Sequence, residues 1–373
     1  MDKKAIVIGA GIVGLATARA LAIRGYKVKV IERTHKAVGA SIRNFGMIWP
    51  VGQPDGELYE RAMLSRSIWK ELCDEAKIWY DETGSLHMAY AKDELAVMTE
   101  FAEQTAASRQ CRILTAEETA VKSAAVVTKD LLGALWSPDE MIVDPRKAIE
   151  AIPHWLEEKY AVEFIWGKAV TDIAYPAVYS GAEEWEADRI FVCSGADFET
   201  LYPQLFAAAP LTKCKLQMMR LGAQPAHERI GPSLCGALSL AHYKGFAVAP
   251  SLQQLKQRFE KDYAEYMQWG IHVMVSQNQA GELTVGDSHE YGPTHDPFDK
   301  QFINELILAY LQQFARFSNE TVIETWNGIY PKLSNGEPHL VLAPEEGVTI
   351  INGLGGAGMT LSFGLCEQLI SKG

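Results

Sequence analysis

The chain has 373 residues, of which 48% are hydrophobic and 22% are charged, as in an ordinary soluble globular protein. This length predicts about two domains. A formal net charge of −12 argues against a general nucleic-acid-binding surface, because an acidic protein repels phosphates. No run is long and apolar enough to span a membrane. The six cysteines are scattered without a C-x-x-C pair, which predicts a cytoplasmic protein with no disulfide framework and no metal site.

Two interpretations compete for residues 1–25, a secretory signal or a nucleotide-binding unit. Two lysines precede an apolar stretch with alanines near its end, much as in a signal peptide. The same stretch contains Gly9, Gly11 and Gly14 in the pattern G-x-G-x-x-G, directly after a short β-branched run. In a nucleotide unit the first glycine permits the tight turn, the second lets the backbone approach a pyrophosphate, and the third lets helix and strand pack closely.

Residues 26–32 favour the nucleotide unit. A good helix former extends from the glycines to Gly25, and the alternating segment 27–31 predicts a strand that completes a β-α-β unit. Glu32 ends that strand about 20 residues after the glycines, where a carboxylate accepts hydrogen bonds from ribose hydroxyls. A signal peptide would leave both the glycine spacing and Glu32 as coincidences, so we interpret residues 1–32 as a dinucleotide site.

After a loop rich in glycine and proline at 39–57, the chain alternates helical and strand patterns up to residue 193. Asp144 and Pro145 fit the N-cap and first position of one helix, which Pro153 is expected to kink or split. The predicted helices cover 58–80, 91–110, a segment with a capping box of Thr115 and Glu118, and 145–160. The predicted strands cover 83–90, 111–114, 162–165, 169–174 and 187–193.

The middle of the chain has a different pattern, and its end returns to the first one. Antiparallel strands are expected at 216–221, 245–248, 271–276 and 282–286, and helices at 251–269 and 301–317. Residues 348–370 repeat the order strand, glycine loop and helix. We therefore predict a discontinuous nucleotide domain at 1–80, 141–215 and 322–373, with a second domain at 81–140 and 216–321.

Five segments together resemble the D-amino-acid oxidase (DAO) family, and within it the glycine oxidase and sarcosine oxidase branches. They are the N-terminal unit, NFGMIWP at 44–50, ADRIFVCSGADFETLYP at 187–203, WNGIYPKLSNGEP at 326–338 and NGLGGAGMTLSFG at 352–364. The resemblance implies an α/β plus α+β fold. Its parts are a Rossmann-like FAD-binding domain, of the glutathione-reductase type and DAO subclass, and an inserted mixed-sheet substrate domain.

The resemblance implies FAD rather than NAD as the cofactor. In support, a second glycine loop at 353–358 precedes a helix, whose N-terminus stabilises the negative charge of a reduced flavin. Some sarcosine oxidases hold flavin through a cysteine, but the matching position here is Gly328, so non-covalent FAD is expected. The implied FAD contacts are Gly9, Gly11, Gly14, Glu32, Arg33, Ser41, Arg43, Asn44, Gly46, Met47, Val170, Ser194, Gly195, Gly353, Gly355, Gly356, Ala357, Gly358, Met359 and Thr360.

Glycine-oxidase-like relatives carry an arginine in a G-x-R-P segment that grips the substrate carboxylate, whereas this chain has Tyr330 there. Tyrosine cannot replace a guanidinium fork. Either the substrate lacks a carboxylate or another base holds it, although a single basic residue is more often a solvated surface charge. The candidate bases are Lys332, Arg43, Lys213, Lys215, Arg220, His242, Lys244 and His272.

A branch that shares the NFGMIWP loop is associated with aminophosphonate breakdown, and lysines or histidines hold a phosphonate well. The resemblance thus implies an amine oxidase for a small anionic amine of the 2-aminoethylphosphonate type, N-methylated or not. Hydride transfer to the flavin gives an imine, which hydrolyses to an aldehyde and an amine or ammonia, while molecular oxygen becomes hydrogen peroxide. No side chain is expected to act as a strong base. The expected pocket residues are Met47, Trp49, Tyr330, Lys332, Arg43 and His272.

Several alternatives stay open. One is a glycine- or sarcosine-type oxidase. Another is a 2-hydroxy-acid dehydrogenase of the same superfamily, which needs a catalytic histidine and an arginine for the carboxylate. A flavin-binding sensor would hold the cofactor without turnover. An NAD reductase is disfavoured because the chain lacks a second complete G-x-G-x-x-G unit with its own acid. Neither a nucleic acid nor a membrane is an expected partner, and the oligomeric state is left open.

Overall fold

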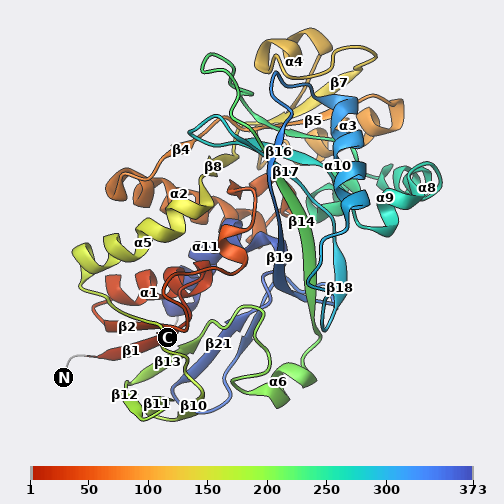
Figure 1. Ribbon diagram of the computed structural model, residues 1–373. Helices are drawn as coiled ribbons and strands as arrows, with labels where there is room; N and C mark the ends of the chain where they lie inside the picture. The colour runs from red at the N-terminus through yellow and green to blue at the C-terminus, as the bar shows by residue number, and fades with distance from the viewer. Residues whose placement is uncertain (1–2, 372–373) are drawn as a thin grey trace.

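The computed structural model of the protein describes residues 3–371 and contains two large β-sheets. The first has the strand order β20-β21-β13-β1-β2-β9, with every neighbouring pair parallel except the antiparallel edge strand β20 (Figure 1). Both ends of the chain contribute to this sheet, as predicted. Its strands are β1 (Lys4–Ile8), β2 (Lys27–Glu32), β9 (Glu163–Trp166), β13 (Arg189–Val192), β20 (Leu340–Leu342) and β21 (Val348–Asn352).

Alternation along the strands assigns the two faces of this sheet to different partners. On β1, Val7 packs with a layer of helices, whereas Ile6 and Ile8 pack with a small three-stranded sheet. Because both faces are covered, the strands are nearly continuous apolar runs. The helices are α1 (Ile12–Ile23), α2 (Glu57–Ala76), α5 (Pro145–Tyr160) and α11 (Gly358–Ser371), and the small sheet is β10 (Asp172–Ala174), β11 (Ala177–Ser180) and β12 (Glu183–Glu186).

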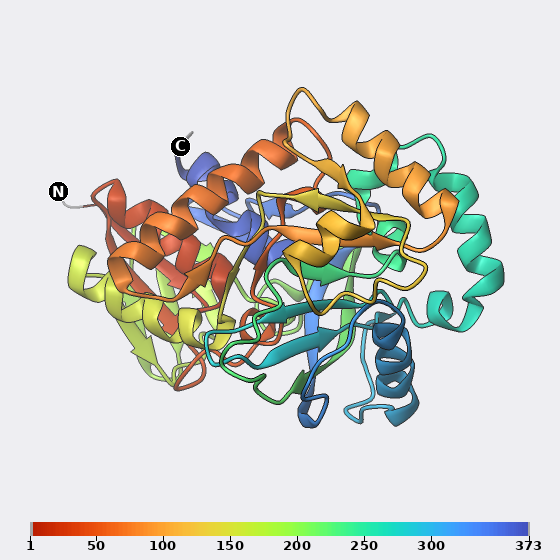
Figure 2. The same ribbon diagram turned by 90° about the horizontal axis from the view of Figure 1, so that it is seen from above.

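The second large sheet has nine strands in the order β18-β14-β17-β16-β15-β5-β7-β6, with β19 paired to β14 outside this path. Seen from above, it lies beside the six-stranded unit, with α8 (Leu252–Asp262) and α10 (Gln301–Phe314) on its outer side (Figure 2). Its strands are β5 (Ser85–Ala89), β6 (Arg112–Leu114), β7 (Gly133–Ser137), β14 (Leu211–Leu221), β15 (Ser233–Cys235), β16 (Met274–Gln277), β17 (Leu283–Gly286), β18 (Glu290–Gly292) and β19 (Val322–Leu333).

Short elements complete the fold and connect the two units. The antiparallel strands β3 (Met47–Ile48), β8 (Met141–Val143) and β4 (Tyr80–Asp81) form a second small sheet. The remaining helices are α3 (Lys92–Gln104), α4 (Ala116–Lys122), α6 (Pro203–Ala208), α7 (Leu238–His242), α8 (Leu252–Asp262), α9 (Ala264–Gln268) and α10 (Gln301–Phe314). Four single turns are 3₁₀ helices, η1 (Ala40–Ile42), η2 (Pro50–Gly52), η3 (Lys244–Val248) and η4 (Gly355–Ala357). Within residues 3–371, no helix combines the length and apolar composition needed to cross a bilayer.

Three details differ from the sequence-based prediction. Residues 245–248 form the 3₁₀ helix η3 rather than a strand, since a short apolar run does not distinguish a strand from a buried turn. The helix expected over 251–269 breaks at Tyr263, whose backbone leaves the helical region, into α8 and α9. Pro153 lies inside α5 without splitting it, and Asp144 caps that helix as predicted.

Strand β14 is longer than predicted and continues across residue 215, the expected boundary between the two domains. It pairs with β19 from Leu211 opposite Leu333 to Leu221 opposite Val322. Both strands therefore belong to the nine-stranded sheet, although they begin or end beside the nucleotide unit. The exact division into domains stays a prediction.

The glycine loop after β1 leaves no room for a side chain at its first and third glycines. A Cβ atom at Gly14 would lie 1.8 Å from the carbonyl oxygen of Gly9, and a Cβ at Gly9 would lie 2.5 Å from the carbonyl oxygen of Cys193. Gly9 also has a φ of +105°, a conformation that favours glycine. The first and third glycines thus fix how α1 sits on the sheet, as the motif predicts.

We expect Gly14→Ala to lower the free energy of unfolding by about 2–3 kcal/mol, because the added methyl forces α1 away from Gly9. Flavin retained after gel filtration, read from the 450 nm absorbance per chain, should fall as well. Gly39→Ala is the matched control, since nothing lies within 4 Å of a Cβ at that position and its φ is −79°. Equal stability and flavin content in the two variants would contradict this account of the loop.

A buried carboxyl group joins the small connecting elements to the nine-stranded sheet. The side chain of Glu140 is fully buried, and its two oxygens accept hydrogen bonds from the Val51 amide and the Ser85 hydroxyl, each at 2.9 Å. Burial raises the pKa of Glu140 from 4.5 to about 7, against the opposing effect of these hydrogen bonds. The folded protein therefore holds this proton more tightly than the unfolded chain does.

It follows that Glu140 destabilises the fold progressively as the pH rises from about 4.5 to about 7. Glu140→Gln removes this titration while retaining a similar shape. We expect the unfolding free energy of the variant, relative to that of the unsubstituted protein, to rise by up to about 3 kcal/mol across this range. Denaturant unfolding at pH 4.5, 6 and 7.5 measures the difference, and a pH-independent difference would refute the assignment.

Candidate functional site

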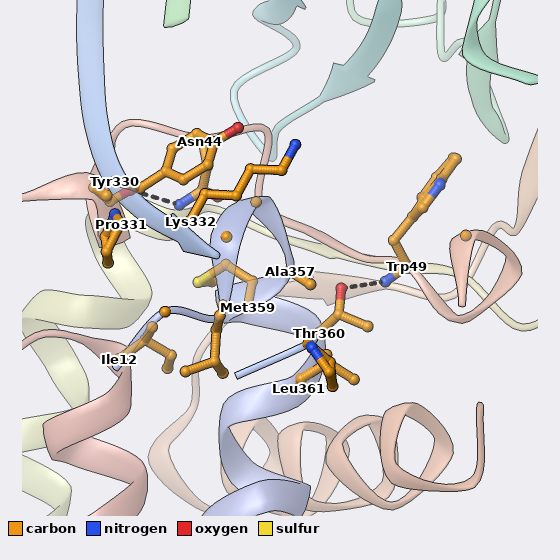
Figure 3. Close-up of a pocket in the computed structure, with 18 of the residues that line it drawn as sticks. Ile12, Asn44, Trp49, Tyr330, Pro331, Lys332, Ala357, Met359, Thr360 and Leu361 are labelled. Atoms are coloured by element: carbon orange, nitrogen blue, oxygen red, sulfur yellow. Dashed lines mark hydrogen bonds between the residues drawn. The ribbon is translucent and has the colours of Figure 1, made fainter. Parts of the chain in front are cut away.

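One cavity lies where the first turns of α1 and α11 meet the loop at 40–49 and the strand β19 (Figure 3). Neither helix has an acidic residue in its first turn. The N-terminal amide groups of a helix carry partial positive charge and lack intrahelical partners. Two such ends, contributed by opposite ends of the chain, make this cavity suited to an extended anionic ligand such as a flavin dinucleotide.

Glycines keep the cavity wall open at the start of α11. A Cβ at Gly356 would lie 3.6 Å from the hydroxyl of Tyr330, and a Cβ at Gly358 would lie 3.6 Å from Ile12. Gly195 has a φ of +59°, and a Cβ atom at this position would have no other atom within 4 Å. Backbone amides are thereby exposed to a ligand without intervening side chains, and the residues present fit FAD.

Of the residues predicted to contact FAD, most line this cavity. The structure places there Gly11, Ser41, Arg43, Asn44, Met47, Gly195, Gly353, Gly355, Gly356, Ala357, Gly358, Met359 and Thr360. Two of them also organise the protein itself. The Ser41 hydroxyl accepts a hydrogen bond from the Ile12 amide at 2.9 Å, and the Asn44 side chain bonds the backbone of its own loop at Ala40, Ser41 and Gly46.

The other predicted contacts do not line this cavity. Glu32 accepts a hydrogen bond from the Ala10 amide at 2.9 Å, so it orders the glycine loop. Arg33 pairs with Asp197 at 2.5 Å. Gly9 and Gly46 are in close-packed turns, and Gly14 is close-packed within α1. Val170 is buried against the six-stranded sheet, and the Ser194 hydroxyl donates a hydrogen bond to the Asp197 carbonyl. Their roles toward FAD stay predictions.

The loop at 45–49 is tied directly to the first turn of α11. The Trp49 amide donates a hydrogen bond to the Thr360 hydroxyl at 2.9 Å (Figure 3). The Trp49 ring turns away from this contact toward Tyr243, 6.2 Å between ring centres, and its buried Nε1 lacks a partner in the described chain. Trp49 and Met47 therefore line the cavity beyond α11, where they were expected as substrate-pocket residues.

Strand β19 places Tyr330 and Lys332 on the cavity side, since residues two apart share a face of a strand (Figure 3). The Lys332 ammonium donates a hydrogen bond to the Tyr291 hydroxyl at 2.8 Å. None of the ion pairs among residues 3–371 includes Lys332, and burial lowers its pKa from the usual 10.5. Lys332 is thus a cation in the cavity without a carboxylate of its own.

The other candidate bases separate into two groups. Arg43, His242, Lys244 and His272 line the cavity, but the Arg43 guanidinium is held by the carbonyls of Val38 and Asn327 at 2.9 and 3.0 Å. The rest are engaged elsewhere: Lys213 pairs with Glu199, Lys215 with Asp299 and Arg220 with Glu282.

The sequence analysis missed how many imidazoles converge on the cavity. His289 and Asp287 line it together with His242 and His272. The ring centres of His242 and His272 are 3.8 Å apart, and those of His272 and His289 are 5.0 Å apart. The histidines are 30 and 17 positions apart in the chain, so no local motif could reveal the cluster. Only the pairing of the strands brings them together.

Comparison with known proteins agrees with this geometry. The model of the family described as "FAD dependent oxidoreductase" (DAO) matches residues 4–371. D-amino acid dehydrogenase of Helicobacter pylori is 24% identical over 53% of this chain and 61% of its own length. The bifunctional tRNA 5-methylaminomethyl-2-thiouridine biosynthesis protein of Pseudomonas entomophila is 26% identical over 93% of this chain and 56% of its own length. The chain thus spans only about 60% of these curated relatives.

Solved structures share the fold along the whole chain. Glycine oxidase from Bacillus cereus superimposes with a TM-score of 0.79 at 17% identity, covering 100% of this chain and 94% of that one. L-α-glycerophosphate oxidase from Mycoplasma pneumoniae, solved with FAD bound, has a TM-score of 0.74 at 16% identity. The superposition covers 100% of this chain and 95% of that one. The predicted fold and the FAD cofactor are confirmed. Since the family model matches nearly every residue, the chain belongs to the DAO family of FAD-dependent oxidoreductases.

Proposed function

We propose that this protein oxidises a small amine that carries an anionic group, at the carbon next to its nitrogen. The observation that carries the proposal is Lys332, a cation that faces the cavity beside the first turn of α11 and has no carboxylate partner in the described chain. A partly buried cation without a counter-ion attracts an anionic ligand. All six cysteines are free thiols, which suits the cytoplasmic location that forms part of the proposal.

The redox chemistry comes from FAD, which supplies a hydride acceptor when bound. The protein positions the cofactor with the glycine loops at 9–14 and 353–358, and the positive end of α11 favours the charge of the reduced state. The apolar walls around Met47, Trp49 and Met274 exclude water. A dry pocket of this kind favours a neutral amine, and catalysis rests on placing its C–H bond correctly.

For the anionic end we propose a phosphonate of the 2-aminoethylphosphonate type, N-methylated or not. Tyr330 replaces the arginine expected in glycine-oxidase-like relatives, and Arg43 cannot substitute because it is anchored to two carbonyls. The remaining groups are the point cations of Lys332 and Lys244 and the imidazoles, which suit a tetrahedral anion better than a flat carboxylate. The imine product then hydrolyses to an aldehyde and an amine or ammonia, with oxygen as the proposed acceptor.

A 2-hydroxy-acid dehydrogenase is the second candidate, because His272 and His289 face the cavity and either could accept a hydroxyl proton. It is less favoured because the cavity offers no free guanidinium for a carboxylate. A glycine- or sarcosine-type oxidase meets the same objection.

Anaerobic reduction of the flavin separates these candidates. The purified holoenzyme is mixed with N-methyl-2-aminoethylphosphonate, 2-aminoethylphosphonate, sarcosine, glycine or a 2-hydroxy acid, and the 450 nm absorbance is followed. We expect fast bleaching only with the phosphonates. Equal or faster bleaching by sarcosine or glycine would overturn the phosphonate assignment. Bleaching by the 2-hydroxy acid alone would favour the 2-hydroxy-acid dehydrogenase. No bleaching with any compound would favour a flavin-binding sensor.

Lys332→Met tests the residue on which the proposal depends. We expect the apparent affinity for the phosphonate substrate to fall about 10-fold to 100-fold, equivalent to a lost charge-assisted contact of about 1.5–3 kcal/mol. The limiting rate of flavin reduction should change less, because Lys332 holds the anion rather than the reacting carbon. Lys147→Met, on the exposed side of α5, is the matched control. Unchanged substrate affinity in Lys332→Met would exclude this role.

A further inference from the structure

We propose that His242, His272, His289 and Asp287 bind a divalent transition-metal ion of the zinc class inside the substrate cavity. Three imidazole nitrogens and one carboxylate oxygen form a ligand set typical of zinc. A ligand atom from each histidine lies within 4.8 Å of the other two, and all four residues line the cavity. The bound ion would take one oxygen of an anionic ligand as a further ligand.

The sheet holds these residues in place. His272 precedes β16 and lies opposite Asp287, which follows β17, through backbone hydrogen bonds of 3.3 and 3.4 Å in both directions. His289 lies two residues beyond Asp287, and His242 ends α7 on the neighbouring side. His272, Asp287 and His289 are at most 6% exposed, whereas His242 is partly exposed. Three ligands are therefore rigid and the fourth borders the open cavity.

The separations between ligand atoms approach those of a tetrahedral site. Nε2 of His272 lies 3.2 Å from one oxygen of Asp287, and Nε2 of His289 lies 3.7 Å from the other. With metal–ligand bonds of about 2.1 Å, the edge of a tetrahedron is about 3.4 Å long. Each nitrogen–oxygen distance is near this edge, but the two distances involve different oxygens of Asp287, so the carboxylate must turn to present one oxygen to the ion. The histidine nitrogens are spread more widely, so modest side-chain rotations must bring the rings together around the ion.

Hydrogen bonding leaves these atoms in the form that a metal needs. Nδ1 of His289 contacts the Gly270 carbonyl at 2.9 Å, so this nitrogen carries the proton and Nε2 presents a lone pair. Both ring nitrogens of His272 and Oδ1 of Asp287 are buried without a hydrogen-bond partner in the described chain. The lone pair on Nε2 of His289 thus faces Oδ2 of Asp287 across 3.7 Å. Only a proton or a cation between two acceptors makes this arrangement favourable.

Neighbouring charges are consistent with a cation that also recruits an anion. Lys332 and Lys244 are the nearby cations. With the ion present the group carries excess positive charge, and a phosphonate would balance it; this last step rests on the proposed function.

The test uses the FAD-loaded enzyme, stripped with a chelator, dialysed against zinc and passed through a desalting column. Zinc per chain is measured by mass spectrometry, and cobalt is substituted to record its visible absorption bands. We expect about one equivalent in the unsubstituted protein. His242→Asn and Asp287→Asn should weaken zinc binding at least about 10-fold, and His154→Asn, at an exposed site on α5, should not. Flavin absorbance and melting temperature confirm that each variant is folded.

Absence of zinc from the unsubstituted protein, or equal zinc in all variants, would overturn the metal site. These readouts need no turnover, so the two proposals fail separately. Bound zinc in an enzyme that no amine reduces would reject only the proposed function. Full-rate flavin reduction by a phosphonate in a protein that binds no zinc would reject only the metal, and would leave the imidazoles as direct partners of the anion.

Discussion

The packing of α1 against α11 is the constraint on which the site depends. The two helices come from opposite ends of the chain, and their N-terminal amides reach one cavity only because they lie side by side. The two helices are in close contact, because the Thr17 hydroxyl on α1 lies 3.3 Å from the Cys366 thiol on α11. The same hydroxyl also donates a hydrogen bond to the Val13 carbonyl. The tight glycine turn before α1 sets the same alignment from the other side. A cofactor with a diphosphate and a reducible ring satisfies both helix ends at once.

The nine-stranded sheet supplies the chemistry that differs from the family pattern. Cavity-lining residues come from several of its strands and from the residues directly before or after them, as His272, Asp287 and His289 do. Lys332 and Tyr330 alternate inward on β19, while Asp287 faces His272 across a backbone pairing. The glycine loops and the nine-stranded sheet therefore line different parts of the same cavity. Under the proposed function, the sheet residues could change without altering the glycine loops that fit the cofactor.

Local signals explain what the sequence could predict. Gly9, Gly11, Gly14 and Glu32 follow a spacing imposed by a single β-α-β unit, so the first strand, helix and strand were predictable within a residue or two. The terminal glycine loop was predictable for the same reason. The histidine cluster was not, because it arises from the register of β16 with β17 and from the end of α7. The strand predicted at residues 245–248 was wrong for a related reason. Gly245 packs against the Val51 backbone, and this long-range contact leaves no signal in the local sequence.

The twelve-residue strand β19 constrains how this protein can change over evolution. It pairs with β14 along almost its whole length, and alternate side chains serve the cavity and the outer face. A substitution at one position alters one group and leaves the others in place. A single-residue insertion or deletion would exchange the two faces and turn Tyr330 and Lys332 away from the cavity. Diversification along this strand must therefore proceed by replacement, so its length should drift far more slowly than its residues.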